Sequence, residues 1–290
     1  MNSYIIATDS NVDLPNSLAN ELELAVIPMQ FSMDGKDYTN YLDHREMSAK
    51  AFYDGLREGK TATTMLINQT AFLAFFEPIL QTGSDILYLC FSSGLSGSCE
   101  QAELAAQTLC SQYPERTIKV IDTRCASMGE GLLVYLAANA KEQGQTLEQA
   151  AKTVEGLIPQ LCQWFTVDDL GHLKRGGRIS GATAMLGTML GIKPILHVDD
   201  HGKLVQRFKA RGRAKALEAL LNQMRETVID PKNQTVFISH GDAREDAEQL
   251  ADMIKQRLGV KDIRIGVIGP VIGAHAGPGT IALFFVGKHR

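Results

Sequence analysis

The chain has 290 residues, of which 44% are hydrophobic and 21% charged, a composition typical of a globular protein with room for two domains. Its 29 basic and 33 acidic residues give a net charge of −4, which argues against a nucleic-acid-binding surface. No apolar stretch reaches the roughly 18 residues of a membrane span, and the start lacks a basic region, so we expect neither a span nor a signal peptide.

Strands and helices alternate in the first half of the chain. The spacing of apolar residues predicts strands at 4–8, 24–33, 85–91 and 118–122, and helices at 49–57, 71–80, 98–112, 131–142 and 147–161. The third and fourth of these strands are continuous apolar runs, which are typical of strands buried on both faces of a parallel sheet. The alternation predicts an α/β protein with helices covering a mostly parallel sheet.

The second half has a different order of elements. We expect strands at 164–168, 195–198, 204–209, 236–240, 263–268 and 281–286, and helices at 182–190, 213–228 and 243–258. The turn Asp199-Asp-His-Gly202 joins two of these strands into a hairpin. A hairpin beside helices predicts a mixed sheet, so we place a domain boundary near residue 160, with domains at 1–160 and 161–290.

The most informative segment is Ser92-Ser-Gly-Leu-Ser-Gly-Ser98, called here the serine corner, between a predicted strand and a predicted helix. Free backbone N–H groups at the helix start, the helix dipole and the hydroxyls can converge there on a small anion. The anion is either a phosphate or a carboxylate. The candidate ligands at this corner are Ser92 and Ser93, with Gly94 as a supporting residue.

Other segments carry further candidates, each of which also has a structural explanation such as a helix cap or a turn. They are Asp9 after the first strand, Thr63 and Thr64 in a loop before a helix, Arg178 in a basic loop (173–179), Arg211 in a basic cluster (209–215), and His275 and Gly277 in a glycine-rich loop (266–279). The five cysteines contain no Cys-x-x-Cys pair, so we interpret them as reduced core residues of a cytoplasmic protein.

Several known motifs are absent. The chain has no Walker A loop, no G-x-G-x-x-G after a strand and no metal-ligand spacing, so we expect no cofactor and no metal. Gly94-Leu-Ser-Gly-Ser98 differs from a nucleophile elbow at its last position. Two alternatives therefore stay open, a serine hydrolase of acyl esters that uses Ser96, an aspartate and His275, and a phosphate- or nucleotide-binding protein.

Taken together, the segments resemble the DegV family of bacterial fatty-acid-binding proteins along the whole chain. The matching segments are Thr8-Asp-Ser-Asn-Val-Asp-Leu-Pro15, Pro28, Asp34-Gly-Lys36, Ser92-Ser-Gly-Leu-Ser-Gly97, Val120-Ile-Asp122, Asp168-Asp-Leu-Gly-His-Leu-Lys-Arg-Gly-Gly-Arg-Ile179, Gly191-Ile-Lys-Pro-Ile-Leu196, Lys209-Ala-Arg211 and Gly273-Ala-His-Ala-Gly-Pro-Gly279. The resemblance implies a two-domain DegV-like fold, an N-terminal mostly parallel sheet with helices on both faces and a C-terminal mixed α/β domain.

The resemblance also implies a function in phospholipid metabolism. A long-chain fatty acid would lie between the domains, its carboxylate held by a threonine (Thr63 or Thr64) and a serine (Ser92 or Ser93), with His275 nearby. The chain would be the non-catalytic acyl-carrying subunit of a fatty acid kinase, and Arg211 would dock to the ATP-binding partner subunit.

The chain departs from the family pattern in two places. Met65-Leu66 follows the threonines where the family commonly has Ser-Gln, and Cys99 stands where an aromatic residue is common. The apolar segment 182–190 offers Met185 and Met189 as adaptable walls for an acyl chain.

Overall fold

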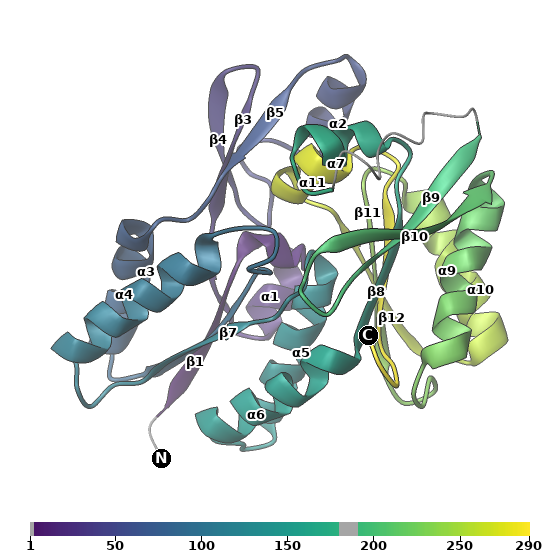
Figure 1. Ribbon diagram of the computed structural model, residues 1–290. Helices are drawn as coiled ribbons and strands as arrows, with labels where there is room; N and C mark the ends of the chain where they lie inside the picture. Colours follow the sequence, from purple (N-terminus) through teal and green to yellow (C-terminus); the bar gives the residue numbers. More distant parts are fainter. Residues whose placement is uncertain (1–2, 180–190) are drawn as a thin grey trace.

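The computed structural model describes residues 3–179 and 191–290 (Figure 1). Its first sheet, sheet A, confirms the predicted parallel arrangement, with strand order β2-β1-β6-β7. These strands are β1 (Tyr4–Asp9), β2 (Ala25–Ile27), β6 (Asp85–Cys90) and β7 (Ile118–Asp122). All six residues of β6 are buried, as its continuous apolar run predicts for a central strand covered on both faces.

Helices cover both faces of sheet A. On one face, Ile86 and Tyr88 of β6 pack in a core with α3 (Gln69–Gln81) and α4 (Ser98–Gln112). On the other, Leu87 and Leu89 pack with α5 (Met128–Glu142) and α6 (Leu147–Leu157). Successive residues of a strand point to opposite faces, so one apolar run supplies both cores.

A second, antiparallel sheet (sheet B) has the order β4-β3-β5. Its strands are β3 (Met29–Met33), β4 (Lys36–Asn40) and β5 (Ala62–Met65), and α2 (Ala49–Arg57) lies between β4 and β5 in the chain. The prediction of one strand over 24–33 was wrong, because the chain leaves sheet A after β2 and enters sheet B at β3. Pro28 stands at this break, where it has no N–H to donate to a ladder. The prediction of a loop at the threonines was also wrong, since they lie in β5.

The second half forms a mixed sheet (sheet C), as predicted, with the order β10-β9-β8-β13-β11-β12. Its strands are β8 (Leu161–Thr166), β9 (Ile192–Val198), β10 (Leu204–Arg211), β11 (Thr235–His240), β12 (Asp262–Val267) and β13 (Ile281–Val286). The helix expected over 147–161 ends earlier, at Leu157, and a 3-10 turn, Ile158–Gln160, which contains Pro159, leads into β8.

Helices also flank sheet C. One core packs its strands against α9 (Arg213–Thr227) and α10 (Arg244–Leu258). On the other face, residues of α5 share a core with Phe165, Phe237 and Phe284, so α5 lies between sheets A and C (Figure 1). The shorter helices are α1 (Asn16–Glu21), α7 (Leu170–Arg175) and α11 (Pro270–Ala276).

The two halves of the chain are in close contact, because α11, from the second half, packs against α2, β3 and β5 of the first. The domain boundary near residue 160 stays a prediction. The helix predicted at 182–190, with Met185 and Met189, lies outside the described residues. In the part of the chain that the structure describes, no helix has the length and apolar character needed to cross a bilayer.

Candidate functional site: a cavity between the sheets

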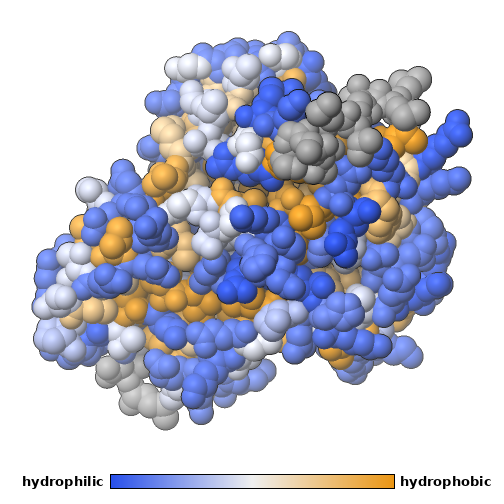
Figure 2. Space-filling model, in the orientation of Figure 1, coloured by the Kyte–Doolittle hydropathy of each residue, from blue (hydrophilic) through white to orange (hydrophobic). Residues whose placement is uncertain are grey.

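A cavity of about 240 Å³ lies where the three sheets meet. Figure 2 shows apolar surface in the middle of this face of the molecule, bordered by hydrophilic surface. Apolar side chains from both halves of the chain make most of the cavity wall, among them Met29, Phe91, Leu95, Phe165, Leu173, Val198, Leu204, Ile268, Val271, Ala282 and Phe284. The wall is therefore suited to an apolar ligand.

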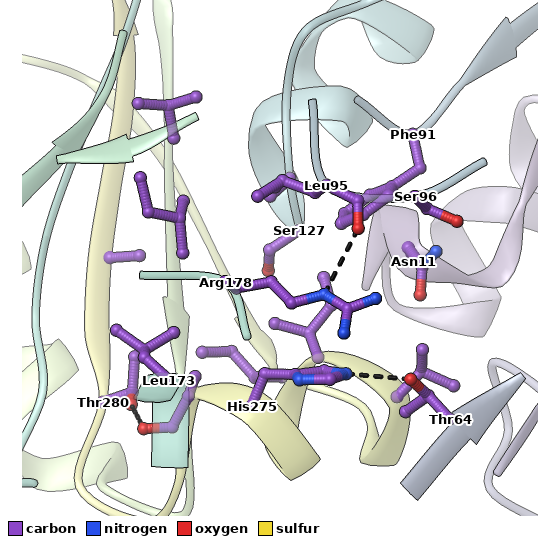
Figure 3. A pocket seen from close by; sticks show the side chains of 18 of the residues that line it. Asn11, Thr64, Phe91, Leu95, Ser96, Ser127, Leu173, Arg178, His275 and Thr280 are labelled. Atoms are coloured by element: carbon purple, nitrogen blue, oxygen red, sulfur yellow. Dashed lines mark hydrogen bonds between the residues drawn. The ribbon is translucent and has the colours of Figure 1, made fainter. Parts of the chain in front are cut away.

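Three polar side chains named by the sequence analysis meet at this cavity (Figure 3). Thr64 Oγ1 and His275 Nε2 are 2.8 Å apart, although 211 positions separate them in the sequence. The guanidinium of Arg178 lies close by, where its Nε donates to the carbonyl of Leu95 at 3.3 Å. One hydroxyl, one imidazole and one positive charge thus form a group of potential donors in a mostly apolar wall.

The strand register decides which threonine belongs to this group. Thr64 of β5 pairs with Phe31 of β3, and Thr63 pairs with Ser32. Neighbouring residues of a strand face opposite ways, so the half-buried Thr64 lines the cavity while Thr63 is exposed.

His275 lies on the last turn of α11. The prediction of a loop at this position, made from its glycine-rich sequence, was therefore wrong. Burial, followed by the charge of Arg178, lowers the pKa of His275 to about 4, so the imidazole is neutral at neutral pH. A Cβ on Gly176, which follows α7, would overlap Nδ1 of His275. Glycine at this position therefore allows the imidazole to lie against the backbone.

The serine corner is divided between the cavity and other contacts. Ser96 lines the cavity, with its Oγ 3.0 Å from that of Ser98. Ser92 is fully buried and donates to the carbonyl of Gly202 at 2.8 Å. Ser93 is exposed and donates to Asp122 Oδ2 at 2.5 Å. Neither Ser92 nor Ser93 is a lining residue, and a ligand role for them stays a prediction.

The hairpin between β9 and β10 explains this division, because its tip lies on the serine corner. Besides accepting from Ser92, the tip approaches Gly94 so closely that a Cβ there would be 2.5 Å from the carbonyl oxygen of His201. Backbone from the second half thus occupies part of the corner that the sequence analysis assigned to an anion.

The other supporting residues lie around the cavity but do not line it. Asp9 is buried and accepts from the backbone N–H groups of Asn11 (2.9 Å) and Phe91 (3.2 Å), so it joins β1 to the start of the serine corner. Burial raises the pKa of Asp9 to about 6. Gly277 ends α11 with φ 79°, in the left-handed region that favours glycine.

Two further buried carboxyl groups lie close enough to Asp9 to interact with its charge. Asp13 accepts from Ser127 Oγ at 2.5 Å and from the Gly269 N–H at 2.8 Å, and burial raises its pKa to about 7. Glu130 accepts from Thr8 Oγ1 at 2.8 Å, and burial also raises its pKa. These carboxyl groups favour the protonated state because water is excluded from them.

Some polar lining residues had no local signal in the sequence. Asn11, Ser127 and Gln163 line the cavity, and only Asn11 lies in a segment singled out by the sequence analysis. Ser127 directly precedes α5, and Gln163 lies in β8. Only the folded structure brings these two residues to the same cavity. Arg211, at the end of β10, is exposed and is not among the lining residues.

The geometry bears on the hydrolase alternative. The hydroxyl of Ser92 is bonded to Gly202, that of Ser93 to Asp122, and that of Ser96 to Ser98. His275 contacts Thr64 and none of these serines. Across residues 3–179 and 191–290, no serine of the corner forms a hydrogen bond with a histidine. The nucleophile–base contact that a serine hydrolase requires is therefore not formed there.

Comparisons with known proteins agree with this architecture. The family model described as an uncharacterised protein of the DegV family matches residues 3–288. A DegV domain-containing protein of Clostridium perfringens is 44% identical over 290 residues, which cover 100% of this chain and 99% of the relative. Another from Streptococcus pyogenes is 36% identical, with 99% of each chain covered.

Solved structures are similar over the same length. A DegV family protein from Thermus thermophilus, described as binding fatty acid, has a TM-score of 0.89 and 32% identity, covering 99% of this chain and 100% of that one. DegV from Bacillus subtilis, described as a fatty acid binding protein, has a TM-score of 0.85 and 26% identity over 99% and 100% of the two chains. From its sequence and its fold, the chain belongs to the DegV family.

Proposed function

We propose that this chain is a non-catalytic carrier in the bacterial cytoplasm that binds a long-chain fatty acid and presents its carboxylate to an ATP-binding kinase subunit. The observation that carries the proposal is the apolar cavity with Thr64, His275 and Arg178 together in its wall. Fatty acid binding by the related proteins of Thermus thermophilus and Bacillus subtilis supports it.

The energetics of such a ligand are favourable. Burial of the roughly fifteen methylene and methyl carbons of a sixteen-carbon fatty acid, at about 0.8 kcal/mol each, contributes about 12 kcal/mol before the costs of association are subtracted. The carboxylate opposes burial unless it is paired. Arg178 supplies a positive charge, and the hydroxyls of Thr64 and Ser96 supply neutral donors, so we assign the carboxylate to this end of the cavity.

The first test is the ligand itself. We expect protein purified from bacteria to release a fatty acid into organic solvent, detected by mass spectrometry, and delipidated protein to take up palmitate or oleate. Finding neither would refute the proposal. Chain length and saturation follow from the same measurement.

The head-group assignment has a matched pair of variants on one strand. Thr64→Val removes a donor from the cavity, whereas Thr63→Val makes the same change on the exposed face of β5. Hydrogen bonds to charged groups contribute about 1.5–3 kcal/mol, so we expect Thr64→Val to weaken binding about 10- to 150-fold. Thr63→Val should bind normally, and equal affinities in both would contradict the assignment.

The serines are compared in the same way. Ser96→Ala should weaken fatty acid binding, because Ser96 lines the cavity, and Ser93→Ala should leave it near the wild-type value. The reverse result would favour Ser93 as the ligand and would require its hydroxyl to leave Asp122.

Docking to the kinase subunit is a separate part of the proposal. The resemblance to the DegV family implies that Arg211 docks to the kinase subunit, and the exposed position of this residue at the end of β10 is compatible with that role. Arg211→Glu should spare fatty acid binding and lower acyl-phosphate formation with the kinase subunit and ATP. Arg225→Glu makes the same charge change near the other end of α9 and serves as the control. Equal rates in both variants would remove Arg211 from the interface.

A further inference from the structure

Cys90 and Cys99 lie at the two ends of the segment that forms the serine corner. Cys90 is the last residue of β6, and Cys99 is in the first turn of α4. Their sulfur atoms are 2.6 Å apart, and the exposed fractions of the two residues are 0% and 2%. A disulfide has an S–S length of about 2.05 Å, so the two side chains already face one another at a separation that small rotations can close.

This arrangement sets the pair apart from the other cysteines. All five cysteines lie in the described residues, and all are free. Cys125 and Cys162 contact backbone carbonyls, of Thr123 and His289 at 3.1 Å each, and Cys110 is only half-buried. Among the cysteines, Cys90 and Cys99 have their sulfur atoms in contact with one another. The sequence analysis interpreted all five cysteines as core residues and predicted no such contact.

We propose that Cys90 and Cys99 are a redox-active thiol pair, which a hydroperoxide oxidises to a disulfide across the serine corner. In the first step, one thiol loses its proton and the thiolate attacks an oxygen of hydrogen peroxide, whose O–O bond breaks to give a sulfenic acid and hydroxide, and the hydroxide takes up the released proton to become water. In the second, the other thiolate attacks the sulfenic sulfur and displaces hydroxide, which takes a proton to become water. Overall, two thiols and one hydrogen peroxide give one disulfide and two waters.

The surroundings make this oxidation slow. Burial, then contact with Cys99 and the charge of Asp122, raise the pKa of the Cys90 thiol, so little thiolate is present at neutral pH. A carboxylate oxygen of Asp122 is within 4.8 Å of both sulfurs, and this residue is only half-buried. The side chain of Asp122 is therefore the neighbour of the pair that reaches toward solvent, and the second thiol is already in place to attack a sulfenic acid on the first.

The disulfide would close a short loop that carries part of the cavity wall. Phe91, Leu95, Ser96 and Gly97 all lie between the two cysteines and line the cavity. A covalent link between the ends of this loop limits the freedom of the unfolded chain. The oxidised protein should therefore unfold at a higher temperature than the reduced protein.

The test is a disulfide map of the full-length protein. Reduced protein is treated with excess hydrogen peroxide, free thiols are alkylated during denaturation, and the product is cut with chymotrypsin, which cleaves after Phe91 between the two cysteines. We expect the peptides that contain Cys90 and Cys99 to stay joined without reductant and to separate with it. The intact protein should lose two hydrogen atoms and unfold several degrees higher.

Cys110→Ser, on the same helix α4, is the matched control and should still form the link, whereas Cys99→Ser should not. Full alkylation of both Cys90 and Cys99 after peroxide treatment would overturn the proposal, as would a link from either to another cysteine. The map needs no added ligand, so its failure is independent of fatty acid binding by the same preparation.

Discussion

Replacing Asp13 is expected to raise the stability of the protein at neutral pH, although most substitutions of buried residues lower stability. The carboxyl group of Asp13 is buried, with one oxygen 2.8 Å from the Gly269 N–H and the other 2.5 Å from Ser127 Oγ. Burial raises its pKa from the ordinary 3.8 to about 7. Between about pH 4 and 7 the folded state holds a proton that the unfolded state has lost, so the free energy of unfolding falls as pH rises.

Asp13→Asn tests this because it keeps the contacts and removes the titration. The amide oxygen can accept from the Gly269 N–H, and the amide nitrogen can donate to Ser127, whose hydroxyl can in turn donate to Ser239 Oγ at 2.9 Å. The φ of residue 13 is 49°, a left-handed value that asparagine tolerates well.

The magnitude follows from the difference between a pKa of 3.8 and one of about 7. At about 1.4 kcal/mol per pH unit, this corresponds to on the order of 4 kcal/mol across the window. We therefore expect Asp13→Asn to match the wild type near pH 4 and to exceed its stability increasingly up to pH 7, by up to this amount.

Urea unfolding from pH 4 to 8, followed by the fluorescence of Trp164, measures the difference. Asp9 and Glu130 add pH dependence of the same sign, and His275, whose pKa is lowered to about 4, adds dependence of the opposite sign. These groups remain in the variant, so the difference between the two curves reports Asp13 together with its charge coupling to Asp9 and Glu130. Parallel curves over this range would refute the reasoning.

Three further predictions concern contacts between the first and second halves of the chain. Gly94→Ala places a Cβ against the hairpin tip and should cost about 1–3 kcal/mol, whereas Gly97→Ala, where the nearest atom is 3.8 Å away, should cost far less in the same urea assay. Ser92→Ala leaves the Gly202 carbonyl without its donor and should cost about 1 kcal/mol, so a neutral result would contradict that contact. Arg290 donates to several backbone carbonyls of both halves, so Arg290→Ala should lower the thermal midpoint, and an unchanged midpoint would show that these contacts contribute nothing.

The sequence determined the elements that have a strong local pattern. The bounds of β7, α2, α4 and β13 were predicted to the residue, because continuous apolar runs, helical spacing and turn residues are local signals. The parallel sheet, the mixed sheet and the family followed from the same signals and from the order of the motifs. His275, Arg178 and one of two threonines were also identified as candidates before any contact among them was known.

Tertiary structure decided which candidates meet. The pairing of β5 with β3 turns Thr64 toward the cavity and Thr63 to the surface, and no feature of the segment itself distinguishes them. The hydroxyl of Ser92 has its acceptor 110 positions away, in the Gly202 carbonyl. Every residue has a backbone carbonyl, so the sequence does not show which carbonyl accepts a hydrogen bond from which hydroxyl. Only the folded structure determines which hydroxyls are already bonded within the protein and which are available to a ligand.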